Sequence, residues 1–508
     1  MELLYYFIFC FSIFIISKLL FQQKKHFPPA PTALPILGHL HLLKKPLHRT
    51  LEALAGQYGP ILSLQFGSRS VLVVSSPSAI EECFTKNDII LANRPYCFAG
   101  EHLAYNYTTV GWSPYGHHWR ILRRVTAIEI FSSNSLQTSS IIRNKEVTHL
   151  VRQLYRGSDG KLQKIELKSI FFQLTLNIAM EMVAAKRLFG DEDFDAELRE
   201  KFLEMKKGQS NPTMFMNMLD FLPFLRWVGF VGEEKNMVRF HRKRDAFLQG
   251  LIDDERRKRM SDTGKAMNGE RRKKTLVDTL LCLQQAEPEY YSDDIIKGII
   301  MVLFTAGTDT SALTLEWAMS LLLNHPEALQ KAKEEIDNNV EQGCLIEDSD
   351  LAKLPYLRGI INETLRLFPV APLLVPHFSS EECTIGGYDV HPGTIVLVNA
   401  WAVHKDPKIW FEPTSFKPER LEGIEGEREG YKFIPFGLGR RGCPGAGMSM
   451  RVVSSLALGA LLQCFEWARV RPEMVDMSEV QGLSMPKAKP LEVMYMPRPT
   501  MINLYSQL

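Results

Sequence analysis

The sequence predicts a mainly α-helical protein with small β-sheets behind one N-terminal membrane-spanning segment. The prediction rests on an apolar run at the N-terminus, a β-rich pair of segments at residues 59–77, and helical periodicity through most of the remaining chain. The 508 residues are 45% hydrophobic and 23% charged, so the chain can bury a large core. The formal net charge of +2 is close to balance, which argues against nucleic acid as a partner.

The N-terminal apolar run covers residues 3–21. In helical conformation about 19 residues rise ~1.5 Å each and nearly cross a hydrocarbon layer ~30 Å thick. Lys18, Lys24 and Lys25 lie at or beyond the end of the run, whereas a cleaved secretory signal carries its positive charge before the apolar segment. We therefore expect residues 1–24 to be an uncleaved anchor, with the following chain on the cytoplasmic side.

Four prolines lie within residues 25–40. Because proline fixes φ and lacks an N–H, this stretch predicts a stiff, non-helical hinge between the anchor and a soluble domain at residues 41–508. The eight cysteines are scattered without C-x-x-C pairs. This spacing argues against a disulfide scaffold or a zinc site and favours a reducing compartment.

Residues 293–324 form the longest helical candidate, and their apolar side chains lie on nearly all faces, so the helix should run through the core. Its middle is the stretch AGTDTS, residues 306–311, which places Gly307, Asp309 and three hydroxyl groups in a buried segment. Two interpretations remain open. The hydroxyl groups bond back to carbonyls one turn earlier, or the helix opens beside a ligand and Thr310 serves chemistry there.

Two further motifs place charged residues at helical spacing. In NETLRL, Glu363 and Arg366 lie three positions apart on one helix face, and FKPERL supplies Arg420 downstream. An isolated pair of this kind is usually a solvated surface pair, but the apolar residues around it favour a semi-buried ion cluster. In PYGHHWRILRR, Trp119 and Arg123 lie four positions apart, so an indole N–H and a guanidinium can point at one anion.

The stretch FGLGRRGCPGAG, residues 436–447, fits two kinds of binding site. Gly437, Gly439 and Gly442 follow the strand-like YKFIPF in the pattern G-x-G-x-x-G, which is typical of a dinucleotide-binding turn. Such a turn is followed by further strand and helix units of a doubly wound sheet, but fewer than about 70 residues remain and they look rich in loops. The position in the chain therefore argues against a dinucleotide site.

The same stretch fits a thiolate site. Its pattern F-x-x-G-x-R-x-C-x-G consists of Phe436, Gly439, Arg441, Cys443 and Gly445. The glycines let the backbone pass close to a flat ligand. Cys443 stands just before an expected helix, where the helix dipole and free N–H groups favour the thiolate over the thiol. The sequence therefore predicts that Cys443 binds a metal.

Together these motifs resemble those of cytochrome P-450s, the haem-thiolate monooxygenases, and in particular the plant microsomal members. The resemblance covers essentially the whole chain in order: anchor, proline hinge, WRILR, AGTDTS, ETLR, PERL and FGLGRRGCPG. It implies the cytochrome P-450 fold and haem b, iron-protoporphyrin IX, as the cofactor. The residues implied at the cofactor are Cys443 as axial iron ligand, Trp119, Arg123, His377 and Arg441 at the propionates, and Phe436 and Gly445 in the cysteine loop. The implied structural triad is Glu363, Arg366 and Arg420.

Two positions depart from the family's pattern. PERL replaces the usual PERF, so Leu421 stands in place of an aromatic residue, which should change local packing more than chemistry. Phe378 stands where related plant sequences often have a polar residue, and nothing in the sequence explains it.

The resemblance also implies an activity, the insertion of one oxygen atom from O2 into an apolar plant specialised metabolite. Electrons would come from an NADPH-cytochrome P-450 reductase, with the catalytic domain on the cytoplasmic face of the endoplasmic reticulum membrane. Thr310 would hold the distal hydrogen-bond network and Asp309 would relay protons, while thiolate ligation favours O–O cleavage. Two alternatives remain. One is an oxygen-independent haem-thiolate isomerase or dehydratase, against which Thr310 counts, and the other is an anchored nicotinamide-dependent oxidoreductase, which would show no Soret band.

Two segments, ANRPYCFAG and YNYTTVGWSPYGHHW, bear on the substrate. They resemble the plant group that contains isoflavone hydroxylases, lignan methylenedioxy-bridge oxidases and some triterpenoid hydroxylases. The substrate implied is a phenylpropanoid, flavonoid, lignan or triterpenoid. By the family's arrangement, the pocket would be lined by Phe98–Val110, Val302–Thr305, Val370–Val375 and Gly482–Met485.

Overall fold

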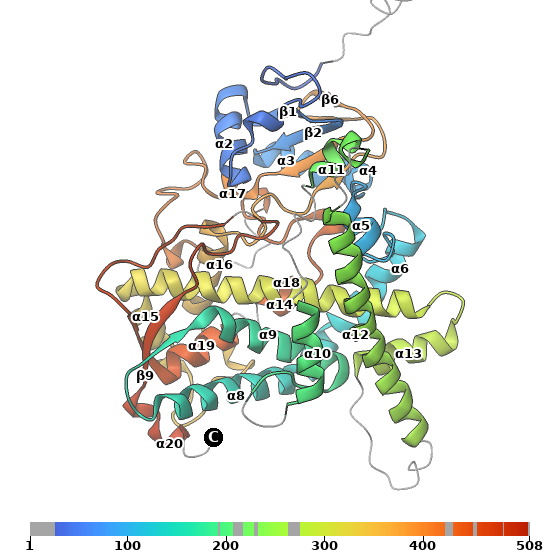
Figure 1. Ribbon diagram of the computed structural model, residues 1–508. Helices are drawn as coiled ribbons and strands as arrows, with labels where there is room; N and C mark the ends of the chain where they lie inside the picture. Colours follow the sequence, from blue (N-terminus) through green and yellow to red (C-terminus); the bar gives the residue numbers. More distant parts are fainter. Residues whose placement is uncertain are drawn as a thin grey trace, which may run out of the picture.

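The described chain is mainly helical with small β-sheets, which confirms the predicted fold class (Figure 1). The computed structural model describes residues 26–190, 194–206, 217–227, 232–262, 275–421, 430–450, 455–480 and 482–505. The predicted anchor at residues 1–24 lies outside the described residues.

The helices and strands have the following bounds. The α-helices are α2 Leu47–Tyr58, α3 Pro77–Phe84, α4 Asp88–Leu91, α5 Phe98–Leu103, α6 His117–Val125, α7 Ser133–Thr138, α8 Ser140–Ser158, α9 Leu167–Ala184, α10 Ala196–Lys206, α11 Met218–Phe221, α12 Gly232–Asp262, α13 Leu276–Ala286, α14 Asp293–Asn324, α15 Pro326–Asn339, α16 Pro355–Leu367, α17 Ala400–His404, α18 Ala446–Met448, α19 Ser455–Cys464 and α20 Ile502–Tyr505. The strands are β1 Ile61–Phe66, β2 Arg69–Val74, β3 Gln163–Glu166, β4 His377–Phe378, β5 Cys383–Ile385, β6 Tyr388–Val390, β7 Ile395–Val398, β8 Phe465–Arg469 and β9 Glu492–Pro497.

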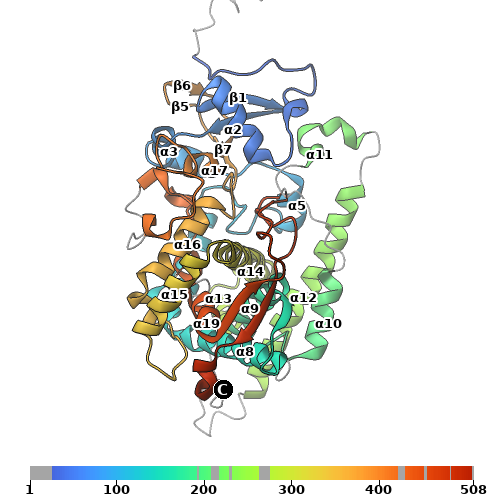
Figure 2. The same ribbon diagram turned by 90° about the vertical axis from the view of Figure 1, so that its left-hand side faces the viewer.

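Helix α14 is the central element, and its bounds are those that the sequence predicts. The Ser292 hydroxyl caps the helix by accepting from the Ile295 N–H, and two aspartates in the first turn complement the helix dipole. The helix ends at Asn324 because Pro326, at the start of α15, cannot continue it. Figure 2 shows α14 nearly end-on, with other helices on several sides of it.

The core packs around the two halves of α14 and leaves its middle less covered. The largest cluster of buried apolar side chains includes the half from Ala312 to Leu323, and the second includes Ile296 to Met301. Between these halves, most of residues 302–310 keep accessible surface. In the described part of the chain, α9 and α14 are long and apolar enough to cross a membrane, but more than half of each apolar window is buried within the protein.

The hairpin predicted at residues 59–77 is confirmed as β1 and β2, which pair antiparallel with Phe66 opposite Arg69. Strand β2 pairs in parallel with β7, which comes from far along the chain, and β7 pairs antiparallel with β4. This four-stranded sheet lies at one end of the molecule, beside α2 and α3 (Figure 1). Two smaller sheets have the strand orders β3-β9-β8 and β5-β6.

Residues 26–39 contain no helix and lie against the first sheet. The Pro29 carbonyl accepts from the Ser63 N–H at 3.0 Å. Gly38 has a φ of 60°, and an added Cβ would lie 2.2 Å from the Gln65 carbonyl oxygen, so this close approach requires glycine. The described part of the proline-rich stretch is therefore fastened to β1.

Candidate functional site

The loop from Phe436 to Gly445 is fixed by backbone contacts. The Cys443 N–H donates to the Phe436 carbonyl at 2.9 Å. Gly439 has a φ of 65°, and an added Cβ would lie 2.4 Å from the Asp88 carboxylate, so the turn requires glycine. The segment YKFIPF before the loop begins in a 3-10 turn, so the expectation of a strand there is wrong. The described residues form no doubly wound parallel sheet, so the loop lacks the setting of a dinucleotide site.

The surroundings of the Cys443 thiol determine its protonation state. Its side chain keeps accessible surface, yet protein surrounds it densely. Burial raises the pKa of the thiol, whereas the N–H groups of Gly445 and Ala446 and the Arg123 guanidinium act in the opposite direction. The free thiol therefore stays protonated at neutral pH, and a metal ion that binds the sulfur reverses this balance.

An accessible face of α14 carries the AGTDTS stretch. Thr305, Ala306 and Gly307 are exposed, and an added Cβ at Gly307 would meet nothing within 4 Å, which indicates open space beside the helix. The helix is nevertheless continuous, and the Thr310 hydroxyl donates to the Ala306 carbonyl at 2.6 Å. Of the two interpretations that the sequence leaves open, the structure shows the first. The opened helix is wrong for this structure, because the hydroxyl bonds the carbonyl one turn earlier without breaking the helix.

Asp309 lies on the same helix, and its carboxyl interacts electrostatically with Lys168 of α9 and Lys206 of α10. Its side chain keeps accessible surface, yet the protein around it raises the pKa of the carboxyl, and Lys206 and Lys168 act in the opposite direction. The Lys206 ammonium lies 3.4 Å from the ring centroid of Phe172 on α9. Asp309 therefore keeps its proton to a higher pH than an ordinary aspartate, which suits a group that transfers protons.

Several cations gather beside the cysteine loop. The Arg441 guanidinium lies 4.5 Å from the ring centroid of Trp119, and both side chains donate to the Val110 carbonyl, at 3.2 and 3.1 Å. Arg123 donates to the Gly442 carbonyl at 2.7 Å, next to the cysteine. The structure thus brings together the predicted Trp119, Arg123 and Arg441. Within the described residues, no carboxylate forms an ion pair with either arginine, so the cluster suits an anionic ligand.

Arg94 completes this cluster, and the sequence analysis missed it. The side chain is buried and donates to the carbonyls of Val375 and Pro376 at 3.1 and 2.7 Å. Burial lowers the pKa of Arg94 to about 9, and burial together with Arg94 and Arg123 lowers the pKa of Arg441 to about 8. The sequence feature that could have indicated Arg94 is its position as the one charged residue in the stretch ANRPYCFAG.

His377 is buried on β4, near Arg94 and Arg441. Its Nδ1 donates to the Leu91 carbonyl at 2.9 Å. Burial, and then the two arginines, lower its pKa to about 3, so the imidazole is neutral and its Nε2 is an acceptor. A carboxylate at Nε2 would have to raise this pKa before His377 could donate to it.

Glu363 is the centre of a buried ion cluster. Arg366 donates to both of its carboxylate oxygens, at 2.7 and 2.8 Å, and neither side chain is exposed. Arg420 lies 3.3 Å from one of these oxygens, and the Lys417 N–H donates to the same oxygen at 3.1 Å. The structure thus brings the three predicted residues together. They join α16 to the PERL turn that precedes the cysteine loop.

The two departures from the family's pattern have apolar surroundings. Leu421 is fully buried in the largest core cluster. Phe378 pairs with Ile395 across β4 and β7, and its ring packs edge-on against Tyr96 at a centroid distance of 6.4 Å. These contacts account for a phenylalanine at position 378.

Two of the segments expected to line the substrate pocket contact α14 at separate places, and a third contacts one of these segments. The Met485 N–H donates to the Val370 carbonyl at 2.9 Å, and the Trp317 indole of α14 donates to the Met485 carbonyl at 2.8 Å. A Cβ atom added at Gly298 of α14 would lie 3.1 Å from the Thr109 methyl, so Thr109 packs closely on this glycine. The expected fourth segment, Val302–Thr305, belongs to α14 itself.

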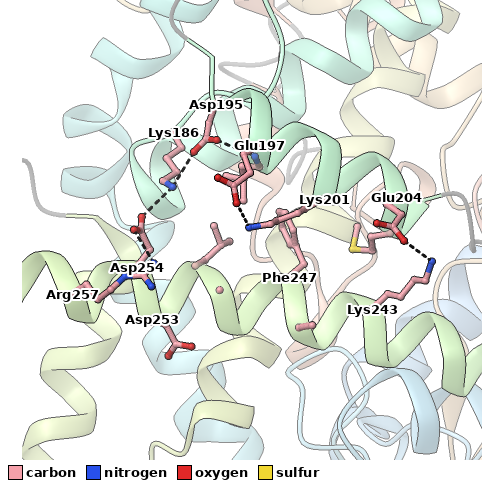
Figure 3. A pocket seen from close by; sticks show the side chains of 15 residues that line it. Lys186, Asp195, Glu197, Lys201, Glu204, Lys243, Phe247, Asp253, Asp254 and Arg257 are labelled. Atoms are coloured by element: carbon pink, nitrogen blue, oxygen red, sulfur yellow. Dashed lines mark hydrogen bonds and ion pairs between the residues drawn. The ribbon is translucent and has the colours of Figure 1, made fainter.

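A separate pocket of about 580 Å³ opens between α10 and α12 (Figure 3). Its charged side chains pair with one another. Lys186 lies 3.0 Å from both Asp195 and Asp254, and Lys243 lies 3.4 Å from Glu204. Its lining includes no residue of α14 or of the cysteine loop. Paired charges do not suit an apolar ligand, so this pocket is not the expected substrate site.

Comparison with known proteins agrees with this fold and site. A family profile described as Cytochrome P450 matches residues 28–493. Cytochrome P450 81Q32 of Catharanthus roseus is 52% identical over 96% of this chain and 94% of that protein. Isoflavone 2'-hydroxylase of Medicago truncatula is 46% identical over 98% of both chains, and (+)-piperitol/(+)-sesamin synthase of Sesamum radiatum is 46% identical over 98% of this chain and 97% of that protein. The chain therefore belongs to the cytochrome P-450 family of monooxygenases.

Family membership implies a haem-thiolate iron, and the residues of this chain fit such a group. Cys443 offers one accessible sulfur. Arg94, Arg123 and Arg441 offer positive charge without carboxylate partners in the described chain, which suits the propionates of a haem. Among the described residues, no group of three or more His, Cys, Asp and Glu side chains could hold a metal ion. A haem needs no such group, because its porphyrin supplies the other ligands of the iron.

Proposed function

We propose that the chain is a membrane-bound haem-thiolate monooxygenase that inserts one oxygen atom from O2 into an apolar plant specialised metabolite. The observation that supports this most strongly is Cys443, an accessible thiol enclosed by protein beside cations that lack carboxylate partners. Haem b fits this arrangement, because one sulfur can bind its iron and guanidinium groups can bind its two propionates.

In this proposal Cys443 binds the iron as a thiolate. The N–H groups of Gly445 and Ala446 stabilise negative charge on the sulfur, and the Phe436 carbonyl fixes the cysteine backbone. Arg94, Arg123, Arg441, Trp119 and His377 form the surroundings of the propionates. The arginines are held by backbone carbonyls, so they are positioned before the cofactor binds.

The bound haem iron supplies the activation of O2. Thr310 and Asp309 hold and move protons. The Thr310 hydroxyl donates to Ala306 in the structure, its oxygen can accept from water, and rotation about one bond redirects its proton toward the accessible space. Asp309 keeps its proton to a higher pH than usual and can pass it to water.

The relatives support an isoflavonoid or lignan substrate. One is named for the hydroxylation of an isoflavone and another for the synthesis of piperitol and sesamin. Apolar side chains such as Val302 and Leu303 lie on the part of α14 that keeps accessible surface. An apolar, ring-containing metabolite fits such a lining.

We further propose that residues 1–24 anchor the enzyme in the endoplasmic reticulum membrane, with the catalytic domain in the cytoplasm. The apolar run and the lysines after it support this. Electrons then come from an NADPH-cytochrome P-450 reductase, because the chain offers no credible flavin or nicotinamide motif. Deletion of residues 1–24 should release much of the protein from the bilayer and keep the haem spectrum. Loss of haem on that deletion would mean that the segment is part of the fold.

The proposed function is tested with microsomes that contain the full chain and a plant reductase. A panel of isoflavones, lignans and triterpenoids is supplied with NADPH, and products are identified by mass spectrometry under 18O2. The proposal predicts a product that carries one 18O atom and forms only with reductase and O2. A product that forms without either would establish the isomerase reading instead. A protein without a Soret band would favour the nicotinamide-dependent alternative.

A further inference from the structure

The loop between α5 and α6 contains an unfavourable backbone conformation. Three consecutive residues, Tyr105, Asn106 and Tyr107, have left-handed conformations with φ of 48°, 52° and 61°. None of them is glycine, so this conformation is unfavourable by itself and persists only where neighbouring contacts impose it.

A partly buried polar cluster supplies such contacts. The Tyr105 hydroxyl donates to a carboxylate oxygen of Asp245 on α12 at 3.0 Å. Lys297 on α14 donates to the same oxygen at 2.6 Å. Lys297 is only 5% exposed, and its ammonium also lies 2.9 Å from Asp294 and 5.5 Å from the Tyr105 ring centroid. One loop residue is therefore tied to two helices at once.

Two further residues of α12 support the same loop. The His241 ring packs edge-on against the Tyr105 ring, with the centroids 4.9 Å apart. Arg244 is buried and donates to the Leu103 carbonyl, at the end of α5. The loop thus has contacts to α12 on both sides of Ala104.

The loop packs on α14 one turn before the accessible stretch begins. Thr109 packs at Gly298, and Gly298, Val302 and Ala306 follow one another at intervals of four residues on one helix face. At its other end, the Val110 carbonyl accepts from both Trp119 and Arg441. The loop therefore spans from α14 to the cations beside the cysteine loop.

We propose that Tyr105, Asp245 and Lys297 form a latch that holds residues 104–110 closed over the substrate space and slows the release of bound ligand. This inference rests on the proposed function, which assigns the accessible face of α14 to the substrate. Burial acts to raise the pKa of Asp245, but hydrogen bonds from Lys297 and Tyr105 hold it below its usual value. The carboxylate therefore stays charged at neutral pH, and Tyr105 acts as a positioning residue for the loop.

Tyr105→Phe tests the latch, because it removes only the hydroxyl group. The matched control is Tyr495→Phe, which removes a buried hydroxyl that donates to the Leu154 carbonyl at 3.1 Å in the core. The full-length holoprotein is loaded with 4-phenylimidazole, an apolar ligand of haem iron, and its dissociation is followed by stopped-flow displacement with carbon monoxide. Imidazole, which is smaller, serves as the second probe.

We expect Tyr105→Phe to release 4-phenylimidazole about 10-fold faster, the effect of one lost hydrogen bond to a charged group, and imidazole less than about 2-fold faster. Asp245→Ala should speed release at least as much, and adding Tyr105→Phe to Asp245→Ala should add little, because the hydrogen bond between residues 105 and 245 is already lost. Unchanged release from Tyr105→Phe, or an equal effect of Tyr495→Phe, would overturn the latch. A wild-type protein without a haem spectrum would overturn the proposed function instead, so the two failures are distinguishable.

Discussion

The Arg441 guanidinium stacks on the Trp119 indole at 4.5 Å, and both groups donate to one acceptor, the carbonyl oxygen of Val110. This contact joins the cysteine loop, α6 and the loop before α6. An arginine that is stacked on a ring and bonded to carbonyls is held in place before any anion arrives. The positive charge beside Cys443 is therefore preorganised.

Arg441→Leu should weaken haem retention. The variant removes a charge-assisted contact to a propionate. We therefore expect haem to dissociate about 10-fold faster. The control is Arg440→Leu, because Arg440 is an exposed neighbour whose guanidinium lies 3.3 Å from Asp88. The measurement is the rate of haem transfer to apomyoglobin. Equal rates for the two variants would show that Arg441 does not hold the propionates.

Glu363→Gln should destabilise the fold. The change leaves Arg366 buried without its carboxylate, and breaking a buried pair in this way costs about 3–5 kcal/mol. Glu419→Gln is the control, because Glu419 pairs with Lys331 at 2.8 Å on the surface, where a pair contributes less than about 1 kcal/mol. Denaturant unfolding of the two variants measures the difference. A loss for Glu363→Gln no larger than for Glu419→Gln would contradict the structural role of the cluster.

Thr310→Ala should uncouple electron consumption from product formation. Its hydroxyl can donate toward the accessible space, which a methyl group cannot do, so product should fall by ~10² while hydrogen peroxide accumulates. Thr314→Ala is the matched control, because Thr314 makes the same backbone bond one turn later, at 3.0 Å, and is buried. The ratio of product to NADPH consumed is measured with reductase present. A similar loss in both variants would mean that Thr310 acts only through helix structure.

His404 should make the protein less stable in acid. Its Nε2 accepts from the Ile434 N–H at 2.9 Å, and burial, Arg366 and Lys405 lower its pKa from 6.5 to about 3. The unfolded chain therefore binds a proton below pH 6.5 that the folded chain refuses until about pH 3. The resulting stability is fully present above pH 6.5 and is lost as the pH falls toward 3.

The free energy of unfolding should accordingly fall by about 1.4 kcal/mol per pH unit through this group alone. His404→Gln keeps an acceptor for the Ile434 N–H but cannot titrate, so its unfolding should depend less on pH by that amount. Denaturant unfolding at several pH values between 7 and 5 provides the comparison. An unchanged pH dependence in His404→Gln would show that His404 is not the group that titrates.

The sequence predicted the elements whose signal is local. The hairpin at residues 59–77 and the helix at residues 293–324 follow from alternation, apolar periodicity and a proline beyond the helix end. The pair Glu363 and Arg366 was visible as helical spacing in an apolar segment. These features need only neighbouring residues, so a single sequence specifies them.

Features that depend on distant segments were not predictable in this way. Arg94 meets Arg441 only because β4 and the cysteine loop come together in the fold. Tyr105 meets Lys297 across almost two hundred residues of chain. The continuity of α14 at Thr310 was also open, because a hydroxyl that bonds to the carbonyl one turn back and a hydroxyl that opens the helix have the same sequence.

The central claim is that the Cys443 sulfur binds the haem iron. The most direct measurement is the carbonyl difference spectrum of the reduced full-length protein, recorded for wild type, Cys443→Ala and Cys344→Ala. Cys344 is a second exposed cysteine and serves as the control. We expect the band characteristic of thiolate-ligated haem in wild type and Cys344→Ala, and its complete loss in Cys443→Ala. An unchanged band in Cys443→Ala would contradict the claim.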